Sequence, residues 1–401
     1  MQPTAGGMFQ YAQCILGALS AIQASEEMDV VVVFGDQQWA PIIEHFNLTS
    51  VKLRHWKIGN LIARILMSLF IPMNFSRLIS RRMNPVVIQM ARLSCDLWIF
   101  PAQDELTWQI GGQVVGTTHD LMHRYERGFP EAGNWLRYHL REYRFLNISR
   151  ASDAVLVDSE TGKQHVLDSY APRPDKINVL PFIAPDYIWA KNVRLDFDSY
   201  YKLPAKFYFY PAQFWPHKNH HRLIDALAEA RRTCSDMALV LSGGFNREYE
   251  SVRQKVAESG LTDAVRFVGY VPDSDIARFY SRARGLVMPT FFGPTNIPPL
   301  EAMATGCPVL ISEAYAMPEQ CGNAALYFKP NSVAEMSERM IKLWTDDKLH
   351  GRLIARGRLR TEAWGQSQFG QRLKEIITNT LQEQSGNDPS NANDCRIRIG
   401  D

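Results

Sequence analysis

The sequence lacks the features of metal-binding, disulfide-stabilised and membrane-spanning proteins. Its six cysteines are scattered over 401 residues, with no Cys-x-x-Cys pair and no histidine cluster at zinc spacing. We therefore expect reduced thiols, no metal site and a cytoplasmic protein. No secretory signal is expected, because residues 1–7 have neither a basic stretch nor an apolar core. The apolar run at 61–71 is too short, and too interrupted by Arg64, to span a bilayer.

Neither sign of charge is in large excess. The 44 Lys and Arg residues nearly balance the 42 Asp and Glu residues, which leaves a net charge of +2. The overall charge therefore gives no case for nucleic-acid binding. The hydrophobic content of 46% is that of an ordinary globular protein. A chain of 401 residues exceeds the usual size of one hydrophobic core, which predicts two domains.

Short apolar runs alternate with helical stretches, and this pattern occurs twice along the chain. Hydrophobicity within the runs is continuous rather than alternating, which indicates strands covered on both faces and hence parallel sheets flanked by helices. The runs are 30–34, 95–100, 113–118, 154–158 and 177–180 in the first half, and 207–210, 238–241, 265–268, 286–288, 309–312 and 325–328 in the second. We expect an α/β protein of two doubly wound, Rossmann-like domains facing a cleft, where ligands of such sheets bind.

Composition sets the expected domain boundaries. Residues 184–204 contain prolines and several aromatics without clear periodicity. This predicts a linker there, between an N-terminal domain at 1–183 and a C-terminal domain at 205–362. Ser, Asn, Asp and Gly are frequent in residues 385–401, so we expect a disordered tail.

One segment, residues 285–310, carries most of the information about function. An apolar strand at 286–289 runs into a loop rich in Gly and Pro, and Pro298 and Pro299 then begin a short helix. The loop and the free amides of the helix can hold an anion. Glu301, in the first helical turn, would repel a bound diphosphate unless its carboxylate faces neutral hydroxyl groups, and a nucleotide offers both phosphates and a ribose. The alternative is that Glu301 only complements the helix dipole.

This segment and four further motifs resemble the retaining GT-B glycosyltransferases of family four. The segment ends in Gly306-Cys-Pro-Val309, and the other motifs are the run Tyr210 to His220, Val268-Gly269-Tyr270, Val157-Asp-Ser-Glu160 and Thr118-His-Asp120. The resemblance extends from Gly6 to about Leu381. It implies that the C-terminal domain binds a nucleotide-diphosphate sugar and that the N-terminal domain binds the acceptor. It also implies that a helix at 363–384 crosses back to the first domain, and that no cofactor or metal is required.

Lys218 is the expected phosphate ligand. It follows a strand and a turn, and its ammonium group suits a diphosphate leaving group, whose developing charge must be stabilised as the glycosyl bond breaks. His217 and His220 could add donors, and Gln213 stands where the family often carries an arginine. The alternative is a solvated lysine at the start of a helix.

Two glycine motifs are expected to contact the nucleotide. Gly243 and Gly244 end a strand, where a missing side chain lets the backbone approach a ligand, although they also fit a plain turn. The resemblance implies that Gly269 and Tyr270 hold the base. The alternative for Tyr270 is packing within a strand.

The N-terminal half contributes two further motifs. His119 and Asp120 close a strand, and the resemblance implies that His119 contacts the donor sugar, although a histidine at a strand end can also be structural. Gly6 and Gly7 resemble the family's first glycine loop, which approaches the diphosphate and the acceptor. Only five residues precede Gly6, so either the start is late or the first sheet lacks its usual first strand.

The chain departs from the family at one position. The family shows Glu, seven residues, then Glu, and counting back from Glu301 gives Gly293. The carboxylate that usually binds the sugar hydroxyls is therefore missing. We expect the amides of Thr295, Asn296 and Ile297, together with the Asn296 side chain, to take its place.

A second signal is electrostatic. Residues 45–94 contain no Asp or Glu, and the stretch from 52 to 92 carries eight Lys and Arg residues interleaved with the apolar run at 61–71. We expect this stretch to lie on an anionic membrane surface. The alternative is a core helix with a solvated basic face.

These residues predict a cytoplasmic glycosyltransferase, peripherally attached to the inner face of the cell membrane. It would move a hexose, most simply mannose from GDP-mannose, to a lipid-linked saccharide acceptor with retention, in cell-surface polysaccharide synthesis. The alternatives are a GT-B nucleotide-sugar epimerase and an inactive nucleotide-sugar-binding scaffold. The expected catalytic residues are His119, Lys218 and Asn296, the donor-binding residues Gly7, Gly243, Gly244, Gly269, Tyr270, Thr295, Ile297 and Glu301, and the acceptor-binding residues Gly6 and Asp120.

Overall fold

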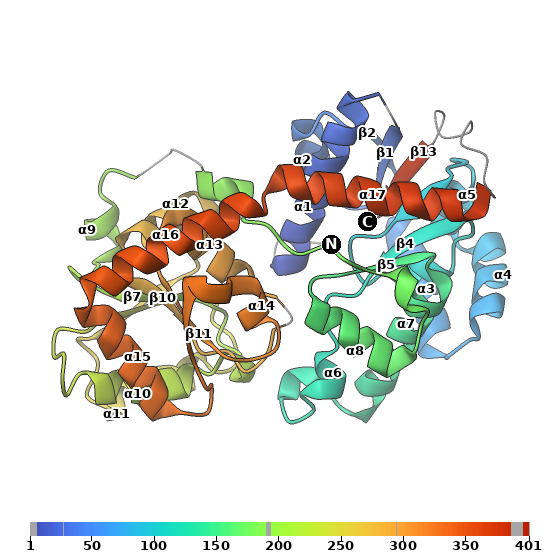
Figure 1. Cartoon of the computed structure of the whole chain (residues 1–401). Coiled ribbons are helices and arrows are strands. Elements are labelled where there is room, and N and C mark those ends of the chain that lie inside the picture. Colours follow the sequence, from blue (N-terminus) through green and yellow to red (C-terminus); the bar gives the residue numbers. More distant parts are fainter. Residues whose placement is uncertain (1–5, 27, 190–193, 294, 386–395, 401) are drawn as a thin grey trace. The chain divides into compact units, whose positions relative to one another are not determined.

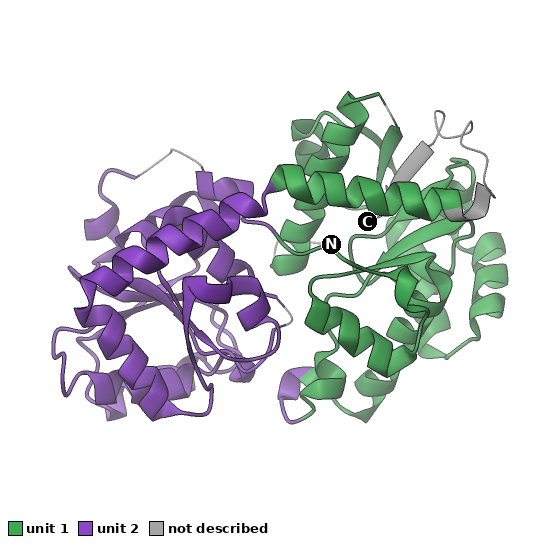
Figure 2. Ribbon diagram, viewed as in Figure 1, with its two compact units in different colours: residues 1–127, 132–182, 366–401 green, residues 128–131, 183–365 purple. Residues whose placement is uncertain are grey.

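A computed structural model of the chain describes residues 6–26, 28–189, 194–293, 295–385 and 396–400 (Figure 1). The chain divides into two compact units (Figure 2). Unit 1 comprises Met1–Arg127, Ala132–Phe182 and Gln366–Asp401, and unit 2 comprises Gly128–Glu131 and Ile183–Gly365. Among the helices of the described ranges, none is both long enough and apolar enough to cross a membrane.

Unit 1 is built on a seven-stranded parallel sheet of order β2-β1-β13-β3-β4-β5-β6. Its strands are β1 Asp29–Phe34, β2 Thr49–Lys52, β3 Leu97–Ile99, β4 Gln113–Thr117, β5 Ala154–Val157, β6 Ile177–Val179 and β13 Arg396–Gly400. All residues of β3, β4 and β5 are buried. Burial on both faces explains why these runs are continuously apolar in the sequence.

The helices of unit 1 cover this sheet. They are α1 Gly7–Ala24, α2 Ala40–His45, α3 Trp56–Ser68, α4 Met73–Met83, α5 Pro85–Ala91, α6 Met122–Tyr125, α7 Trp135–Ala151, α8 Glu160–Tyr170 and α17 Gln366–Ser385. The last of these lies beside α1 (Figure 1), where Gln366 Nε2 donates to the Cys14 carbonyl at 3.2 Å. Further along α17, the Thr380 carbonyl accepts from Gln113 Nε2 at 3.0 Å.

The strand β13 corrects the prediction of a disordered tail over 385–401. Residues 396–400 pair in parallel with β1 on one side and with β3 on the other. Composition predicted disorder because it reports only local hydrophobicity, whereas two strand edges in the sheet supply backbone partners to this segment. Residues 386–395 and 401 lie outside the described residues. No described strand precedes α1 in sequence, and β13 lies between β1 and β3.

Unit 2 contains a six-stranded parallel sheet of order β12-β11-β10-β7-β8-β9. Its strands are β7 Tyr208–Pro211, β8 Leu239–Ser242, β9 Val265–Gly269, β10 Gly285–Met288, β11 Val309–Ser312 and β12 Ala325–Phe328. Its helices are α9 Phe197–Tyr201, α10 His220–Ala230, α11 Tyr249–Glu258, α12 Asp273–Arg282, α13 Ile297–Thr305, α14 Met317–Cys321, α15 Val333–Thr345 and α16 Asp347–Ala363. The strand order is that of the Rossmann fold, with its reversal between β7 and β10.

The predicted linker at 184–204 is part of unit 2 rather than a separate connection. Phe197 and Tyr201 of α9 are buried, and their rings lie 4.9 and 4.7 Å from that of Phe279. The Tyr201 hydroxyl also donates to Asp275 at 2.6 Å. The main segment of unit 2 therefore begins at Ile183 and not at residue 205. The sequence pattern missed this because the segment packs through isolated aromatics without a helical period. Residues 190–193 lie outside the described residues.

Candidate functional site

The carboxyl ends of β7 and β10 mark the point in unit 2 where ligands of doubly wound sheets bind. The loops that follow these two strands are tied to each other. The His217 carbonyl accepts from the Phe291 amide at 2.8 Å and from the Thr290 hydroxyl at 3.2 Å. Asn219 Nδ2 donates to the Pro289 carbonyl at 2.9 Å. The two loops thus form one fixed rim at this end of the sheet.

Lys218 lies in this rim, at the end of a 3-10 turn at Pro216–Lys218. Its amide donates to the Trp215 carbonyl at 2.9 Å, and its carbonyl accepts from the Tyr210 hydroxyl at 3.0 Å. The next residue, Asn219, is left-handed with φ of 60°. These backbone contacts fix where the half-buried Lys218 side chain starts, next to the switch point, as the phosphate prediction requires.

The two neighbouring histidines behave differently from each other. His217 Nδ1 lies 2.8 Å from Glu131 Oε1. His220 is 2% exposed and packs between the rings of Tyr210 and Phe214, 4.9 and 4.6 Å away. Burial lowers the pKa of His220 to about 3, and its ring nitrogens have no hydrogen-bond partner among the described residues. His220 is therefore a neutral core residue, and the expectation that it donates to a ligand is wrong.

Glu301 is buried and held by two tyrosines. The Tyr280 hydroxyl donates to Oε2 at 2.6 Å, and the Tyr187 hydroxyl donates to Oε1. Burial raises the pKa of Glu301, and the two hydroxyl donors only partly offset this. Because α13 begins at Ile297, Glu301 lies beyond the first turn, where the helix dipole has little effect. Each carboxylate oxygen keeps a second acceptor position, which is what a ribose contact requires.

Asn296 and Gly293 share one space. Asn296 Nδ2 lies 3.3 Å from Met317 Sδ, and its backbone exchanges two hydrogen bonds with the Gln320 side chain, at 3.0 and 2.6 Å. A Cβ atom added at Gly293 would lie 2.1 Å from Asn296 Nδ2. The carboxamide therefore occupies the position where a side chain at residue 293 would begin. Pro298 and Pro299 have no N–H, so the N–H groups at the start of α13 are those of Asn296 and Ile297. That of Asn296 already donates to Gln320 Oε1, so the expectation that it binds the sugar is wrong.

Gly243, directly after β8, packs against Gly269, the last residue of β9. Gly243 has φ of +148°, and a Cβ atom there would lie 2.2 Å from the Ala212 carbonyl oxygen. Its amide donates to the Gly269 carbonyl at 2.9 Å. Gly243 is thus required by backbone packing, whereas Gly244 has open space around it.

An exposed aromatic pair accompanies these glycines. Tyr270 is 76% exposed, which excludes the alternative that it packs within a strand. Phe245, 67% exposed, was missed by the sequence analysis; its ring edge lies 3.7 Å from where a Cβ atom of Gly269 would be. The only signal for Phe245 was its place directly after Gly243-Gly244. The two rings offer flat surfaces at the carboxyl ends of neighbouring strands.

His119 in unit 1 already contacts acceptors through both ring nitrogens. Nδ1 lies 3.0 Å from Asp158 Oδ1, and Nε2 lies 3.1 Å from the Pro101 carbonyl. Burial alone would lower the pKa of His119, but the Asp158 carboxylate and these hydrogen bonds outweigh it, so the pKa is raised. Two acceptors call for a doubly protonated ring. Asp158 was present in the Val157-Asp-Ser-Glu160 motif, but its pairing with His119 was not predicted.

The remaining predicted residues of unit 1 occupy element ends. Asp120 Oδ1 accepts from the Met122 amide at 3.0 Å at the start of α6. Gly6, with φ of 62°, precedes α1, and Gly7 is the first helical residue. Tyr11 of the same helix lies edge-on to His119, with the ring centroids 4.9 Å apart. Unit 1 thus gathers the start of α1 and the end of β4 in one region.

Comparisons with known proteins agree with this fold. Residues 196–360 match the family model described as glycosyl transferases group 1. The chain is 36% identical over 119 residues to "O-antigen chain mannosyltransferase B" of Escherichia coli, covering 30% of this chain and 31% of that protein. It is 30% identical over 219 residues to "O-antigen chain mannosyltransferase RfbU" of Salmonella typhimurium, covering 54% of this chain and 56% of that protein. The matches thus span from under a third to just over half of these relatives.

A solved structure extends the likeness of fold to nearly the whole chain. The structure of Anabaena Alr3699/HepE in complex with UDP and glucose matches with a TM-score of 0.70 and 15% sequence identity, covering 94% of this chain and 98% of that one. At this identity the match is evidence for the fold alone. Both units are Rossmann-like, as the sequence predicted. Residues 196–360 therefore resemble the group 1 glycosyltransferases, and the chain has the GT-B fold.

Proposed function

We propose that the protein transfers mannose from GDP-mannose to a lipid-linked saccharide with retention, in cell-surface polysaccharide synthesis. The observation that carries this proposal is the fixed rim at the β7 and β10 ends, where Lys218 and the start of α13 stand at the ligand position of the sheet. The O-antigen mannosyltransferases among the relatives support mannose as the sugar.

Each donor-side residue then has a separate task. Lys218 stabilises the charge that develops on the diphosphate as its bond to the anomeric carbon breaks. Glu301 accepts from the ribose hydroxyls, with Tyr187 and Tyr280 fixing the carboxylate. The amides of Thr295 and Ile297 and the Asn296 carboxamide bind the sugar hydroxyls in place of the missing family carboxylate, since the Asn296 amide already donates to Gln320 Oε1. The glycines Gly243, Gly244 and Gly269 let the nucleotide approach, and the base packs on Tyr270.

The unit 1 residues complete the proposal. His119 lies beside the donor sugar without donating a hydrogen bond to it, because Asp158 and the Pro101 carbonyl engage both of its ring nitrogens. Gly7 approaches the diphosphate. Gly6 and Asp120 lie on the acceptor side.

The test is a donor screen with mass-spectrometric detection. Incubation with GDP-mannose and a lipid-linked saccharide should give mannosylated acceptor and GDP, while UDP-glucose should not react. A changed sugar nucleotide without acceptor would indicate an epimerase instead. Binding of GDP-mannose without any turnover would indicate an inactive scaffold. Either result contradicts the proposal.

The basic stretch supports attachment to a membrane. The helices α3 and α4 and the connection between them expose eight large apolar side chains, namely Ile58, Leu61, Ile65, Leu69, Phe70, Phe75, Leu78 and Met83. Exposed Lys57, Arg64 and Arg82 lie on the same two helices. Such a surface suits insertion beside anionic headgroups at the inner face of the cell membrane. A core helix with a solvated basic face would instead have buried these apolar residues.

The membrane proposal predicts binding to anionic liposomes that salt weakens. The variant should spare Arg77, which donates to the Trp108 carbonyl, and Arg81, whose guanidinium packs on Gly111. The exposed residues Lys57, Arg64 and Arg82 should be replaced by Gln. Loss of about 1 kcal/mol for each charge, about 3 kcal/mol in all, corresponds to a more than hundredfold weaker partition. The matched control removes the same charge at Arg150, Arg232 and Arg352. Equal sedimentation of both triple variants would refute the surface.

A further inference from the structure

Unit 1 contains a cavity of about 330 Å³ that no motif of the sequence predicted. It lies between α6 and the first turns of α7, outside the residues that match the family model. Its size is at the lower end of the range for small-molecule sites. The lining residues are His123, Arg127, Ala132, Gly133, Asn134, Trp135, Tyr138 and His139.

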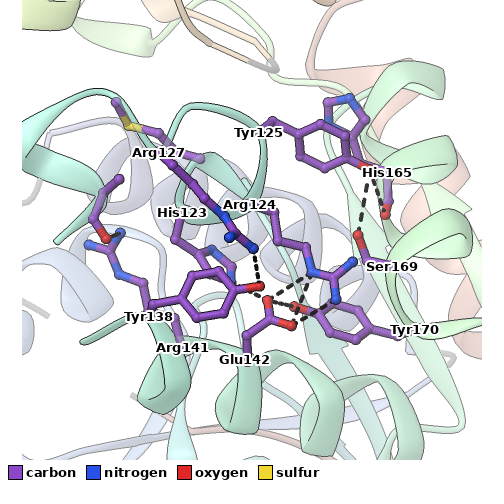
Figure 3. Close-up of polar contacts among 12 residues, drawn as sticks. His123, Arg124, Tyr125, Arg127, Tyr138, Arg141, Glu142, His165, Ser169 and Tyr170 are labelled. Carbon is purple, nitrogen blue, oxygen red and sulfur yellow. Dashed lines mark hydrogen bonds and ion pairs between the residues drawn. The ribbon is translucent and has the colours of Figure 1, made fainter. Parts of the chain in front are cut away.

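The layer beneath the cavity is rigid and its charge is compensated. The Glu142 carboxylate accepts from His123 Nε2 at 2.6 Å, from Arg124 at 2.8 Å and from the Tyr170 hydroxyl at 3.1 Å (Figure 3). Burial lowers the pKa of His123 despite the nearby carboxylate. Arg141 donates to the Ala132 carbonyl at 3.3 Å and so holds the turn before α7. The floor therefore contributes a neutral histidine, and Glu142 is engaged by its own three donors.

The wall of the cavity combines a cation with aromatic rings. Arg127 lies over the ring of Tyr138, with its guanidinium carbon 4.2 Å from the ring centroid, and donates to the tyrosine hydroxyl at 2.6 Å (Figure 3). Trp135 is 75% exposed, and its ring lies 4.3 Å from that of His139. No Asp or Glu lines the cavity, and within the described residues no carboxylate forms an ion pair with Arg127.

This lining has a cationic donor and aromatic rings but no carboxylate acceptor. A neutral sugar presents hydroxyl groups that need acceptors as well as donors, so it would leave some of them unpaired. An anionic group on a sugar needs only donors, and the planar guanidinium of Arg127 can bind such a group with two parallel bonds. An exposed indole provides a flat apolar surface for the ring itself.

We propose that this cavity binds a saccharide ring that carries an anionic group, with the ring on Trp135 and the anion on Arg127. In a glycosyltransferase this is the acceptor, and that assignment alone rests on the proposed function. The anionic group is a phosphate or a carboxylate attached to the sugar. Both offer negatively charged oxygens that accept hydrogen bonds from a guanidinium group.

The test is calorimetry on the whole chain with saturating GDP, so that the nucleotide site does not contribute. Mannose 1-phosphate should bind at least tenfold more tightly than either mannose or inorganic phosphate. Arg127→Gln and Trp135→Ala should each lose at least tenfold in affinity, while Arg137→Gln, a neighbouring exposed arginine outside the lining, should bind as the unchanged protein does. Glucuronic acid compared with mannose 1-phosphate then distinguishes carboxylate from phosphate.

The outcomes that overturn the proposal are specific. If Arg127→Gln binds mannose 1-phosphate as tightly as the unchanged protein does, the proposed anion contact is refuted. If inorganic phosphate binds as tightly as mannose 1-phosphate, the proposed ring contact is refuted. Both variants replace exposed side chains, and a melting curve for each confirms that it is folded. Turnover of GDP-mannose by the unchanged protein is measured separately. Absence of that turnover would refute the proposed function while leaving the binding result to stand on its own.

Discussion

Removing the Glu301 carboxylate tests whether the two tyrosines or a ribose is its main partner. In the structure the carboxylate is 4% exposed and accepts from Tyr187 and Tyr280. Glu301→Gln keeps the volume and one oxygen acceptor, whereas Glu301→Ala removes both acceptors and leaves the buried Tyr280 hydroxyl without its partner. A residue that served only the nucleotide would affect binding but not the stability of the protein alone.

The size of the effect follows from the two hydrogen bonds. A hydrogen bond to a charged group contributes about 1.5 to 3 kcal/mol, so two give about 3 to 6 kcal/mol. Burial of the charge offsets part of this, as the raised pKa of Glu301 indicates, and the loss should lie near the lower end. For a unit of this size, about 3 kcal/mol corresponds to a fall in Tm of about 6 to 12 °C. Glu301→Gln should lose less than half as much.

The assay combines thermal unfolding with calorimetry of GDP binding. Glu362→Ala, an exposed carboxylate on α16, is the matched control and should leave Tm unchanged. Because burial raises the pKa of Glu301 in the folded protein above its ordinary value, ionised Glu301 is disfavoured by folding. The stability of the unchanged protein relative to Glu301→Gln should be greatest below this value and decline as pH rises through the folded pKa. An unaltered Tm in Glu301→Ala would refute the role of the tyrosines, and unaltered GDP affinity would refute the ribose contact.

Three further predictions concern other parts of the site. Lys218→Ala should lower turnover tenfold to hundredfold with little change in Tm, because charge on the leaving group is greatest in the transition state; single-turnover kinetics beside a melting curve decide this. Asn296→Ala should reduce sugar transfer at least tenfold while GDP affinity stays intact, and Gly293→Glu should destabilise the protein less in that background, since the Asn296 carboxamide then no longer has to move aside. Equal loss of GDP binding would mean that Asn296 only shapes the loop. The raised pKa of His119 predicts that its ion pair with Asp158 stabilises the fold fully below about pH 6.5, and that this stabilisation is lost as pH rises through the folded pKa. Urea unfolding of Asp158→Asn and of the unchanged protein, at pH 6 and at pH 9, measures the stabilisation. A difference in unfolding free energy that is the same at both pH values would contradict the prediction.

The sequence predicted the two parallel sheets because a strand buried on both faces is continuously apolar, and this can be seen within the strand's own residues. The apolar runs at 154–158 and 309–312 correspond to β5 and β11, which are buried throughout. The loop rich in Gly and Pro before α13 was also predictable from the sequence, since proline fixes its own φ angle and glycine permits conformations that other residues avoid. The strand β13 and the packing of α9 could not be predicted from their own residues, because partners far away in the chain determine them.

The same distinction between local and distant interactions applies to the proposed donor site. The sequence by itself determined which residue types stand after each strand, and from these it predicted Lys218 and Glu301 as nucleotide-sugar ligands. Only the tertiary structure decided that Tyr187, 114 residues away, donates to Glu301, that His220 is locked between rings, and that the Asn296 side chain fills the space at Gly293. The physical reason is that residue identity and local spacing fix backbone conformation and burial, whereas hydrogen-bond partners, charge states and shared volume depend on which distant side chains the fold brings into contact.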